Sequence, residues 1–356
     1  STHGGSEMTS QQAVPWLRET EVFTSGAEGY HTFRIPSLAI TPDGTILAFC
    51  EGRRHGQHDY DALYLVLKRS TDNGVTWGPL QLLYGNGENT FHNPTVVVDR
   101  DTGRVFLTFN RDAFRCYVMH SDDNGATWSE AVDITDSIMP SNWTHYVMAP
   151  GKGIQMKSGR LAIPAGHHDS HRMDSIFSHS HMFYSDDHGA SWQVGGALPG
   201  GSNECEMVET ADGSLYMAVR AANRQLQKRL CAWSKDGGET WSDLIELDEL
   251  TDAVCQASIV RYTDAETHDK NRIIFGNLDS TTRDHFTLRV SYDECQTWAT
   301  KKVLYTGPSA YSDMAIAPDM TICCLYERGS DGPYESLRLA QFNLAWLTDG
   351  ADQLEG

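Results

Sequence analysis

Short apolar runs recur along the whole chain, and polar or turn-forming residues separate them. Ala62–Lys68, Arg104–Phe109 and Leu215–Val219 are typical, since each is bounded by Gly, Asp, Asn or Pro. Runs of this kind are typical of β-strands joined by tight turns. No stretch keeps a helical period long enough to cover a parallel sheet. The pattern therefore predicts an all-β protein.

Five octapeptides of the type Ser-x-Asp-x-Gly-x-Thr-Trp divide these runs into units of similar length. Asp and Gly favour a tight turn, and the Trp that follows can fill an apolar gap beside it. The fifth copy is degraded, because Cys295 stands where the others have Gly. The copies begin 49 to 64 residues apart, at Ser70–Trp77, Ser121–Trp128, Ser185–Trp192, Ser234–Trp241 and Ser291–Trp298.

A repeat of about 50 residues is the size of one four-stranded blade of a β-propeller. The chain length then allows about six or seven blades, and we favour six. We predict a six-bladed β-propeller of four-stranded antiparallel blades, formed by one domain over residues 16–350 after a flexible segment over residues 1–15. The last blade is expected to close with strands near Ser336–Leu344 and Glu21–Thr24. The octapeptides would lie on outer turns and act as scaffold.

Composition narrows the range of partners. The 356 residues carry a net charge of −20, which argues against nucleic acid and acidic membrane surfaces. No apolar run approaches the ~20 residues of a membrane-spanning helix. The eight Cys and fifteen His follow no metal-ligand spacing, so we expect buried Cys, no metal and no cofactor. An anionic substrate would need a local cluster of Arg, which salt screening allows to act at short range.

Two segments carry candidate chemistry early in the chain. Phe33-Arg34-Ile35-Pro36 places an Arg among apolar neighbours, where a buried charge needs a partner. Glu51-Gly52-Arg53-Arg54 follows the next predicted strand and leads into His55–Asp61, which holds two loop carboxylates.

A third segment repeats the arrangement of strand, turn and strand later in the chain. Glu204 precedes the hairpin Glu206–Val219, and Arg220 ends its second strand. Because side chains alternate along a strand, Glu204 and Glu206 share a face and the pattern does not separate them.

With the octapeptides, the Phe-Arg-Ile-Pro motif resembles the exo-sialidases, or neuraminidases, of bacterial and animal type. The resemblance extends from about Tyr30 to about Leu344. It implies a six-bladed propeller that removes terminal sialic acid from glycans. Sialylated glycoproteins, glycolipids and oligosaccharides are then the expected partners.

The resemblance also implies roles for individual residues. Arg34, Arg220 and Arg283 match the three Arg that bind the substrate carboxylate, with Arg289 as the competitor of Arg283. Asp59 matches the acid/base, with Asp61 as runner-up. Glu204 matches the residue that activates the nucleophile, with Glu206 and Glu209 nearby, and Tyr311 in Ser-Ala-Tyr-Ser-Asp matches the nucleophile. Further pocket residues implied are Arg53, Glu51, Asn93 and His167, while Arg54, His92, His168 and Trp143–Tyr146 stay open.

The residue types suit the chemistry of a sugar that carries a carboxylate at its anomeric carbon. Arg binds carboxylates by charge-assisted and bidentate hydrogen bonds. A carboxylate nucleophile would be repelled there, and sialidases use Tyr instead. Since free Tyr has a pKa of ~10, a neighbouring base is needed to take its proton. A covalent Tyr–sugar intermediate with net retention follows.

Three alternatives remain at this level. The same site could transfer sialic acid to another sugar, or could hydrolyse a related nine-carbon keto acid. A non-catalytic, glycan-binding propeller would keep the octapeptides but would not need the six polar residues together. We expect a monomer or weak oligomer that is secreted or periplasmic, because the implied substrates are extracellular and the N-terminus has a processed appearance.

Overall fold

The computed structural model describes residues 12–355, and most of its regular structure is β-strand. The prediction of an all-β protein is therefore confirmed. Helical segments are short, namely α2 (Thr135–Ile138), η1 (Ser175–Phe177) and α3 (Leu344–Leu347). No helix in the described residues is long and apolar enough to cross a membrane. Of the segment expected to be flexible, residues 1–11 lie outside the described part of the chain.

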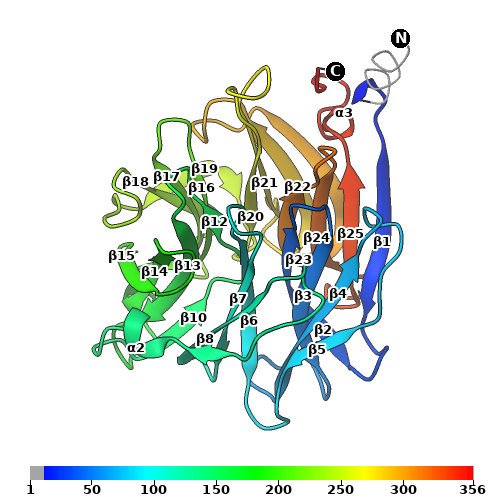
Figure 1. The fold of residues 1–356 in the computed structure, drawn as a ribbon. Coiled ribbons are helices and arrows are strands. Elements are labelled where there is room, and N and C mark those ends of the chain that lie inside the picture. Colours follow the sequence, from blue (N-terminus) through cyan, green and yellow to red (C-terminus); the bar gives the residue numbers. More distant parts are fainter. Residues whose placement is uncertain (1–11, 356) are drawn as a thin grey trace.

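Hydrogen bonding divides the described strands into five sheets (Figure 1). Two of them are four-stranded antiparallel meanders in chain order. The first contains β2 (Thr32–Ile40), β3 (Ile46–Arg53), β4 (Leu63–Ser70) and β5 (Gln81–Tyr84). The second contains β16 (Ser202–Glu209), β17 (Leu215–Ala221), β18 (Lys228–Ser234) and β19 (Ile245–Thr251).

Two further sheets have five strands because short segments join them. One contains β6 (Phe91–Val98), β7 (Val105–Arg111), β8 (Arg115–Ser121), β9 (Val132–Asp133) and β11 (Gly151–Lys152). The other contains β10 (His145–Met148), β12 (Ile154–Gln155), β13 (Leu161–His168), β14 (Ser178–Ser185) and β15 (Gln193–Ala197). Among the named strands, β11 runs parallel to its neighbour, β6, and the other pairs are antiparallel.

The fifth sheet has seven strands because the 17-residue β23 belongs to two hydrogen-bonded halves. Its residues up to Pro308 pair with β22, and those from Ser309 onward pair with β24. A count of six separate sheets is therefore not confirmed. The strands are β20 (Ser258–Thr263), β21 (Arg272–Leu278), β22 (Asp284–Ser291), β23 (Thr300–Ile316), β24 (Ile322–Arg328), β25 (Ser336–Phe342) and β1 (Leu17–Thr24).

The N-terminal strand closes this sheet at its edge. In Figure 1, β1 (blue) lies beside β25 (red), and the two strands pair antiparallel from Leu17↔Phe342 to Thr24↔Ser336. The expected partnership of the two ends of the chain is confirmed, although β1 begins before Glu21.

Each octapeptide begins on the last residue of the third strand in its unit and forms the same turn. In the first copy, the Ser70 hydroxyl and the Thr76 amide donate to the Asp72 carboxylate at 2.8 and 2.9 Å. The fifth copy keeps the turn, because the Cys295 amide donates to Ser291 Oγ at 2.9 Å, as Gly does elsewhere. Cys295 adopts φ 71° to do so, a region that costs a non-glycine residue about 1–2 kcal/mol. The turn therefore tolerates the lost Gly.

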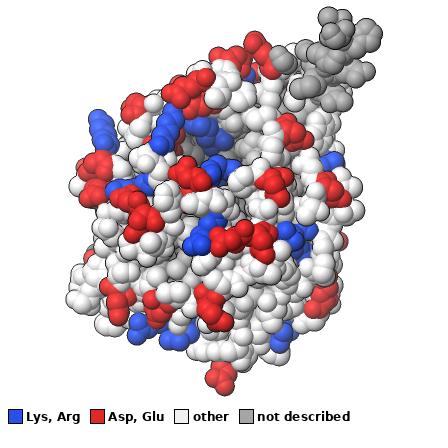
Figure 2. Space-filling view, in the orientation of Figure 1, with Lys and Arg blue, Asp and Glu red and all other residues white. Residues whose placement is uncertain are grey.

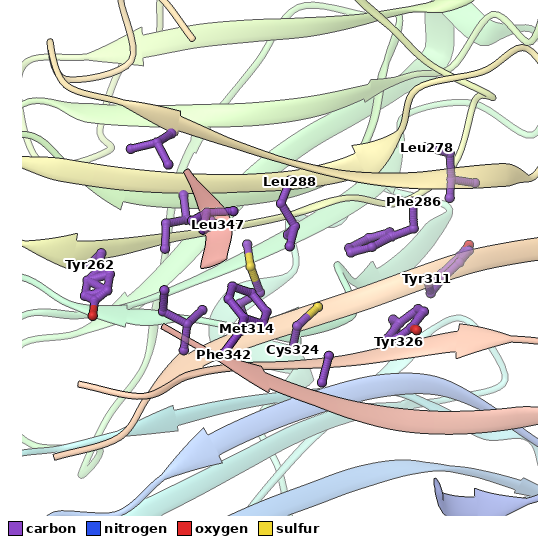
Figure 3. Packing of buried hydrophobic residues seen from close by; sticks show 14 of the residues in the cluster. Tyr262, Leu278, Phe286, Leu288, Tyr311, Met314, Cys324, Tyr326, Phe342 and Leu347 are labelled. Atoms are coloured by element: carbon purple, nitrogen blue, oxygen red, sulfur yellow. The ribbon is translucent and has the colours of Figure 1, made fainter. Parts of the chain in front are cut away.

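The apolar core lies between neighbouring sheets. Cys323 and Cys324 pack into different clusters, as expected for adjacent residues of one strand. All eight Cys are buried and free, which agrees with the expectation that most fill small core positions. Figure 3 shows Tyr311 at one end of the cluster that also contains Met314 and Tyr326.

One irregularity recurs in the first strand of several units and prepares the site. The pairing shifts by one residue between Arg34 and Ser37 in β2, and equivalent shifts occur in β6, β16 and β23. Ile35 and Asn93 have positive φ at two of these points. Such β-bulges bend a strand and re-aim its side chains. Arg34, Asn93, Glu204 and Tyr311 all lie at these bulges.

Candidate active site

Tyr311 and Glu204 form a tight pair across two different sheets. The Tyr311 hydroxyl on β23 donates to Glu204 Oε2 on β16 at 2.6 Å. Arg220 Nη1, from β17, donates to Glu204 Oε1 at 2.6 Å and to the Tyr311 hydroxyl at 3.3 Å. Burial raises the pKa of Tyr311 well above its ordinary value, and the nearby Glu204 charge adds to the effect. The Tyr311 phenol therefore keeps its proton at neutral pH and donates it in a hydrogen bond to the Glu204 carboxylate.

Three guanidinium groups surround Tyr311. Besides Arg220, the Cζ atoms of Arg34 and Arg283 lie 4.9 and 5.7 Å from the centre of the Tyr311 ring. Tyr334 lies between these two Arg, because Arg34 stacks over its ring at 3.9 Å and Arg283 Nη1 donates to its hydroxyl at 2.7 Å. The structure thus brings together all three Arg that the sequence singles out, in a protein whose overall charge is strongly negative. Figure 2 shows the Asp and Glu side chains that are spread over one face.

Glu327, which the sequence did not point to, fixes Arg34 and the backbone of Tyr311. Its carboxylate accepts from Arg34 Nε and Nη2 at 2.8 and 3.0 Å, and from the amides of Ile35 and Tyr311 at 3.0 and 2.9 Å. Burial of the Arg34 guanidinium opposes its charge, but Glu327 outweighs this effect and raises the pKa of Arg34. Glu327 is fully buried. It therefore holds one guanidinium and the Tyr311 backbone in fixed relation.

Asp59 lies in an exposed loop at the edge of the Arg cluster. Its carboxylate is 2.8 Å from Arg53 Nη1 and 3.7 Å from Arg34 Nη1, and its side chain is 64% exposed. Partial burial of this carboxyl favours the neutral form, but the charges of Arg53 and Arg34 outweigh it and lower the pKa. The Asp61 carboxylate instead accepts a hydrogen bond from the backbone amide of Ala62. Of the two loop carboxylates, Asp59 is the one beside the Arg cluster.

Glu51 and Asn93 support this edge of the site. Glu51 Oε1 accepts from Arg53 Nη2 at 2.7 Å, and Oε2 accepts from the Asn93 amide at 2.8 Å. Asn93 Nδ2 donates to the Met148 carbonyl at 2.8 Å. Burial raises the pKa of Glu51, although Arg53 opposes the shift. These contacts fix the position of Arg53 and of the strand that carries Asn93.

His167 has a different setting from the other predicted residues. Its ring is stacked on Trp143 with 3.4 Å between centroids, and its Nδ1 lies 2.8 Å from Nδ1 of His181. The residue is only 4% exposed. In the described part of the chain, its contacts are with this aromatic group and not with the Arg cluster.

The competing residues take other partners. Glu206 accepts from Lys152, Glu209 accepts from the Lys157 amide, and Arg289 lies 3.4 Å from Asp279. Arg54 stacks over Tyr64 at 3.9 Å, and His92 accepts from the Ala113 amide. For metal ions, the described residues contain one group within reach of a shared ion, formed by Asp99, Asp101 and His188. His188 Nδ1 and Gln155 Nε2 already hydrogen-bond to the Asp99 carboxylate.

Comparisons with known proteins agree with this geometry. A family model described as a BNR repeat-like domain matches residues 44–324. A sialidase of Micromonospora viridifaciens is 32% identical over 94% of this chain. The exo-alpha-sialidase of Aspergillus fumigatus is 31% identical over 90% of this chain and 86% of the fungal protein, and human Sialidase-3 is 31% identical over 87% and 89%. The chain belongs to the sialidase family.

Membership of the sialidase family makes the chain a glycoside hydrolase. The match covers 55% of the Micromonospora sialidase, so the chain spans about half the length of that relative. Among solved structures, the Hadza microbial sialidase Hz136 has a TM-score of 0.80 at 24% identity, covering 91% of this chain and 68% of that one. The intramolecular trans-sialidase of Ruminococcus gnavus has a TM-score of 0.77 at 19% identity, covering 92% and 98%. These structures share a propeller-type fold with this sialidase-family chain.

Glu327 and Tyr334 are the residues of this site that sequence reasoning missed. Glu327 is near the end of β24, the second strand of its unit, which is where Arg53 lies in β3 and Arg220 in β17. The repeated position was the available signal. Tyr334 lies in the loop after β24 and had no distinguishing context.

Proposed function

We propose that this sialidase-family protein is an exo-sialidase that hydrolyses terminal α-linked sialic acid through a covalent bond to Tyr311. The observation that carries the proposal is the Tyr311–Glu204 hydrogen bond of 2.6 Å inside a ring of three Arg side chains. An isolated Tyr–Glu pair would have many structural explanations. A Tyr–Glu pair beside three guanidinium groups fits a nucleophile that must approach an anionic sugar.

Arg34, Arg220 and Arg283 are proposed to bind the substrate carboxylate. Arg34 uses Nε and Nη2 for Glu327, which leaves Nη1 on the side of Asp59. Charge-assisted bonds from such fixed guanidiniums are short and directional. The net charge of −20 repels anions at long range, but physiological salt screens it over about 8 Å. Capture therefore depends on the local cluster.

The first chemical step forms the bond between Tyr311 and the sugar. Glu204 takes the phenolic proton as Tyr311 Oη attacks the anomeric carbon, and Arg220 Nη1 stabilises the developing phenolate. The bond from that carbon to the leaving oxygen breaks, and Asp59 gives its proton to this oxygen. In the second step Asp59 takes a proton from water, the water oxygen replaces Tyr311 Oη, and Glu204 returns the proton. Two inversions give net retention.

Asp59 must be protonated for the first step, although Arg53 and Arg34 lower its pKa. A substrate carboxylate bound to Arg34 would neutralise part of that positive charge, and the sugar would exclude water from the exposed carboxyl. Both changes raise the pKa of a carboxylic acid. The proposal thus assigns the protonation of Asp59 to substrate binding.

The proposed architecture is a six-bladed propeller. The support is the division of β23, because no residue of that strand pairs with both β22 and β24. The seven-stranded sheet then consists of one blade from β20 to the first half of β23 and a second from its other half to β1. The three blades that provide β2, β16 and β23 meet at the Tyr311 site.

The test compares Tyr311→Phe with Tyr262→Phe on a fluorogenic α-sialoside. Tyr262 is a matched control, because its hydroxyl donates to the Met320 carbonyl away from the Arg cluster. We expect kcat to fall at least about 1000-fold in Tyr311→Phe and to change less than threefold in Tyr262→Phe. Trapping with a fluorinated sialosyl fluoride should add one sugar mass to the Tyr311 peptide. An inactive pure wild-type protein, or a label on another residue, would contradict the proposal.

Transfer of sialic acid to another acceptor is distinguished by the product. Hydrolysis incorporates one oxygen from labelled water into the released sugar, whereas intramolecular transfer releases an anhydro sugar without it. We expect labelled free sialic acid. The solved trans-sialidases are below 25% identity to this chain and share its fold, so they do not favour transfer.

A further inference from the structure

Lys152 lies where the first strands of several sheets meet. Its ammonium group donates to Glu206 Oε1 on β16 at 2.6 Å, to Asp313 Oδ1 on β23 at 3.2 Å and to the Ile259 carbonyl on β20 at 2.9 Å. Its own short strand, β11, pairs with β6. The neighbouring Gly151 carbonyl accepts from the Ser37 hydroxyl on β2 at 2.5 Å. One segment therefore joins five strands that come from four sheets.

The two carboxylates that Lys152 contacts are close in sequence to the proposed catalytic pair. Glu206 is two residues after Glu204 on β16, and Asp313 is two residues after Tyr311 on β23. No backbone pairing joins β16 to β23, because they belong to different sheets. In the described residues, the Tyr311–Glu204 hydrogen bond and Arg220 link these strands at the reacting groups themselves, and the Lys152 bridge links them two residues further along each strand. The bridge therefore sets the separation of the strands beside the reacting groups.

The surroundings of Lys152 are built for this contact. Glu206 and Asp313 are fully buried, and the Lys152 side chain is 12% exposed. A Cβ atom at Gly151 would lie 2.4 Å from Glu206 Oε2, so only Gly lets the carboxylate approach this closely. Asp313 Oδ2 also accepts from the Leu38 amide, and Glu206 Oε1 from the Ile259 amide. Each carboxylate is thus held by a neighbouring sheet as well as by Lys152.

The buried group of Lys152, Glu206 and Asp313 contains more carboxylates than cations. Two carboxylates face one ammonium, and Glu206 Oε2 has no hydrogen-bond partner in the described residues. Burial and the Asp313 charge raise the pKa of Glu206, and the Lys152 ammonium opposes the shift. A buried ion pair is by itself weak support for stability. Its retention here suits a role in fixing geometry.

We propose that Lys152 is a positioning residue, which holds Tyr311 and Glu204 at reacting distance by clamping Asp313 and Glu206. The inference rests on the proposed function of that pair. Lys152 does not touch the sugar and takes no part in proton transfer. Because a misplacement of about 1 Å can cost 100-fold in rate, loss of the clamp acts on kcat. Substrate affinity depends on the Arg cluster, in which Glu327 holds Arg34 and Tyr334 contacts Arg283 without Lys152. Only Arg220 is paired with Glu204, so we expect affinity to change less than kcat.

The experiment compares Lys152→Met with Lys157→Met in the complete chain. Lys157 is a matched control, because its ammonium is half-exposed and pairs with Asp264 and Glu266. We measure kcat and KM on the fluorogenic sialoside and the Kd of 2,3-didehydro-sialic acid, at a temperature well below unfolding. Lys152→Met should lower kcat about 10- to 100-fold, with KM and Kd within threefold of wild type. Lys157→Met should match wild type.

Equal kcat values in Lys152→Met and wild type would overturn the inference and leave the proposed function intact. A parallel loss of kcat and analogue affinity would also overturn it, because the whole site would then have been disturbed. An inactive wild type would overturn both proposals. If Lys152→Met does not fold, the same measurements are made on Lys152→Met/Glu206→Gln, which removes one of the two carboxylates left without a cation.

Discussion

Replacing Glu327 by Gln tests how far the site depends on a residue outside the proposed chemistry. Four donors point at its two carboxylate oxygens: Arg34 Nε, Arg34 Nη2 and the amides of Ile35 and Tyr311. A Gln side chain has nearly the same size but offers one oxygen and one NH2 group. Two donors keep an acceptor, and the other two face hydrogen atoms.

The magnitude follows from the bonds that are lost. One charged and one neutral hydrogen bond contribute about 1.5–3 and 0.5–1.5 kcal/mol, so the free energy of unfolding should fall by about 3 kcal/mol. The displaced Arg34 should lower kcat/KM about 100-fold, which corresponds to about 2.7 kcal/mol of transition-state stabilisation.

Urea denaturation and the fluorogenic assay measure the two effects of Glu327→Gln separately. Glu294→Gln is the matched control, since Glu294 pairs with Arg261 and accepts from the Ala211 amide away from Tyr311. This control should lose stability but keep kcat/KM within twofold. A kcat/KM of Glu327→Gln within threefold of wild type would refute the reasoning, because Arg34 would then hold its position without the carboxylate.

Three further predictions concern the cluster, the turns and pH. Arg34→Lys should lower kcat/KM at least 100-fold, because an ammonium cannot replace the bidentate contact with Glu327, whereas Arg289→Lys should not. Asp123→Ala should lower Tm, because the Asp123 carboxylate accepts hydrogen bonds from Ser121 and Thr127. Its kcat/KM should equal that of wild type. A loss of activity would instead place the octapeptide near the chemistry. Burial lowers the pKa of His92 to about 4, below the unfolded value of about 6.5. As pH falls, the unfolded chain therefore binds the proton first. The free energy of unfolding should fall by up to about 3 kcal/mol between pH 6.5 and pH 4. Urea denaturation at several pH values should show this slope reduced in His92→Gln, and an unchanged slope would contradict it.

Local sequence patterns predicted the all-β class and the location of the two closing strands, because the formation of strands and turns depends on short-range features. The octapeptides fix turns through contacts within eight residues, so their positions could be identified directly. The expectation that strands near Glu21–Thr24 and Ser336–Leu344 close the last blade agrees with the pairing of β1 with β25. The division of the strands into separate sheets could not be predicted, because it depends on how β23 continues from its pairing with β22 to its pairing with β24.

The candidate site shows the same limit. Alternation along a strand could not separate Glu204 from Glu206, and the bulge in β16 determines what each residue faces. Asp59 and Asp61 differ only by the loop geometry that brings one of them to Arg53. Glu327 is 293 positions from Arg34, and its only signal was a position near the end of the second strand of its unit, like those of Arg53 and Arg220. His167 matched a loop position by resemblance, but a stacked Trp covers its ring.

The pairing of β1 with β25 also determines when, during synthesis, the seven-stranded sheet can be completed. Roughly 310 residues separate Thr24 from its partner Ser336, so at about 5–20 residues per second the first strand waits about 15–60 s for the last. Until then β1 is an unpaired edge, which other chains could join. Arg34 must wait equally long for Glu327, which β24 supplies. The Arg cluster therefore completes only after β24 has been made, and a nascent chain stalled before β24 would have its octapeptide turns but no complete site.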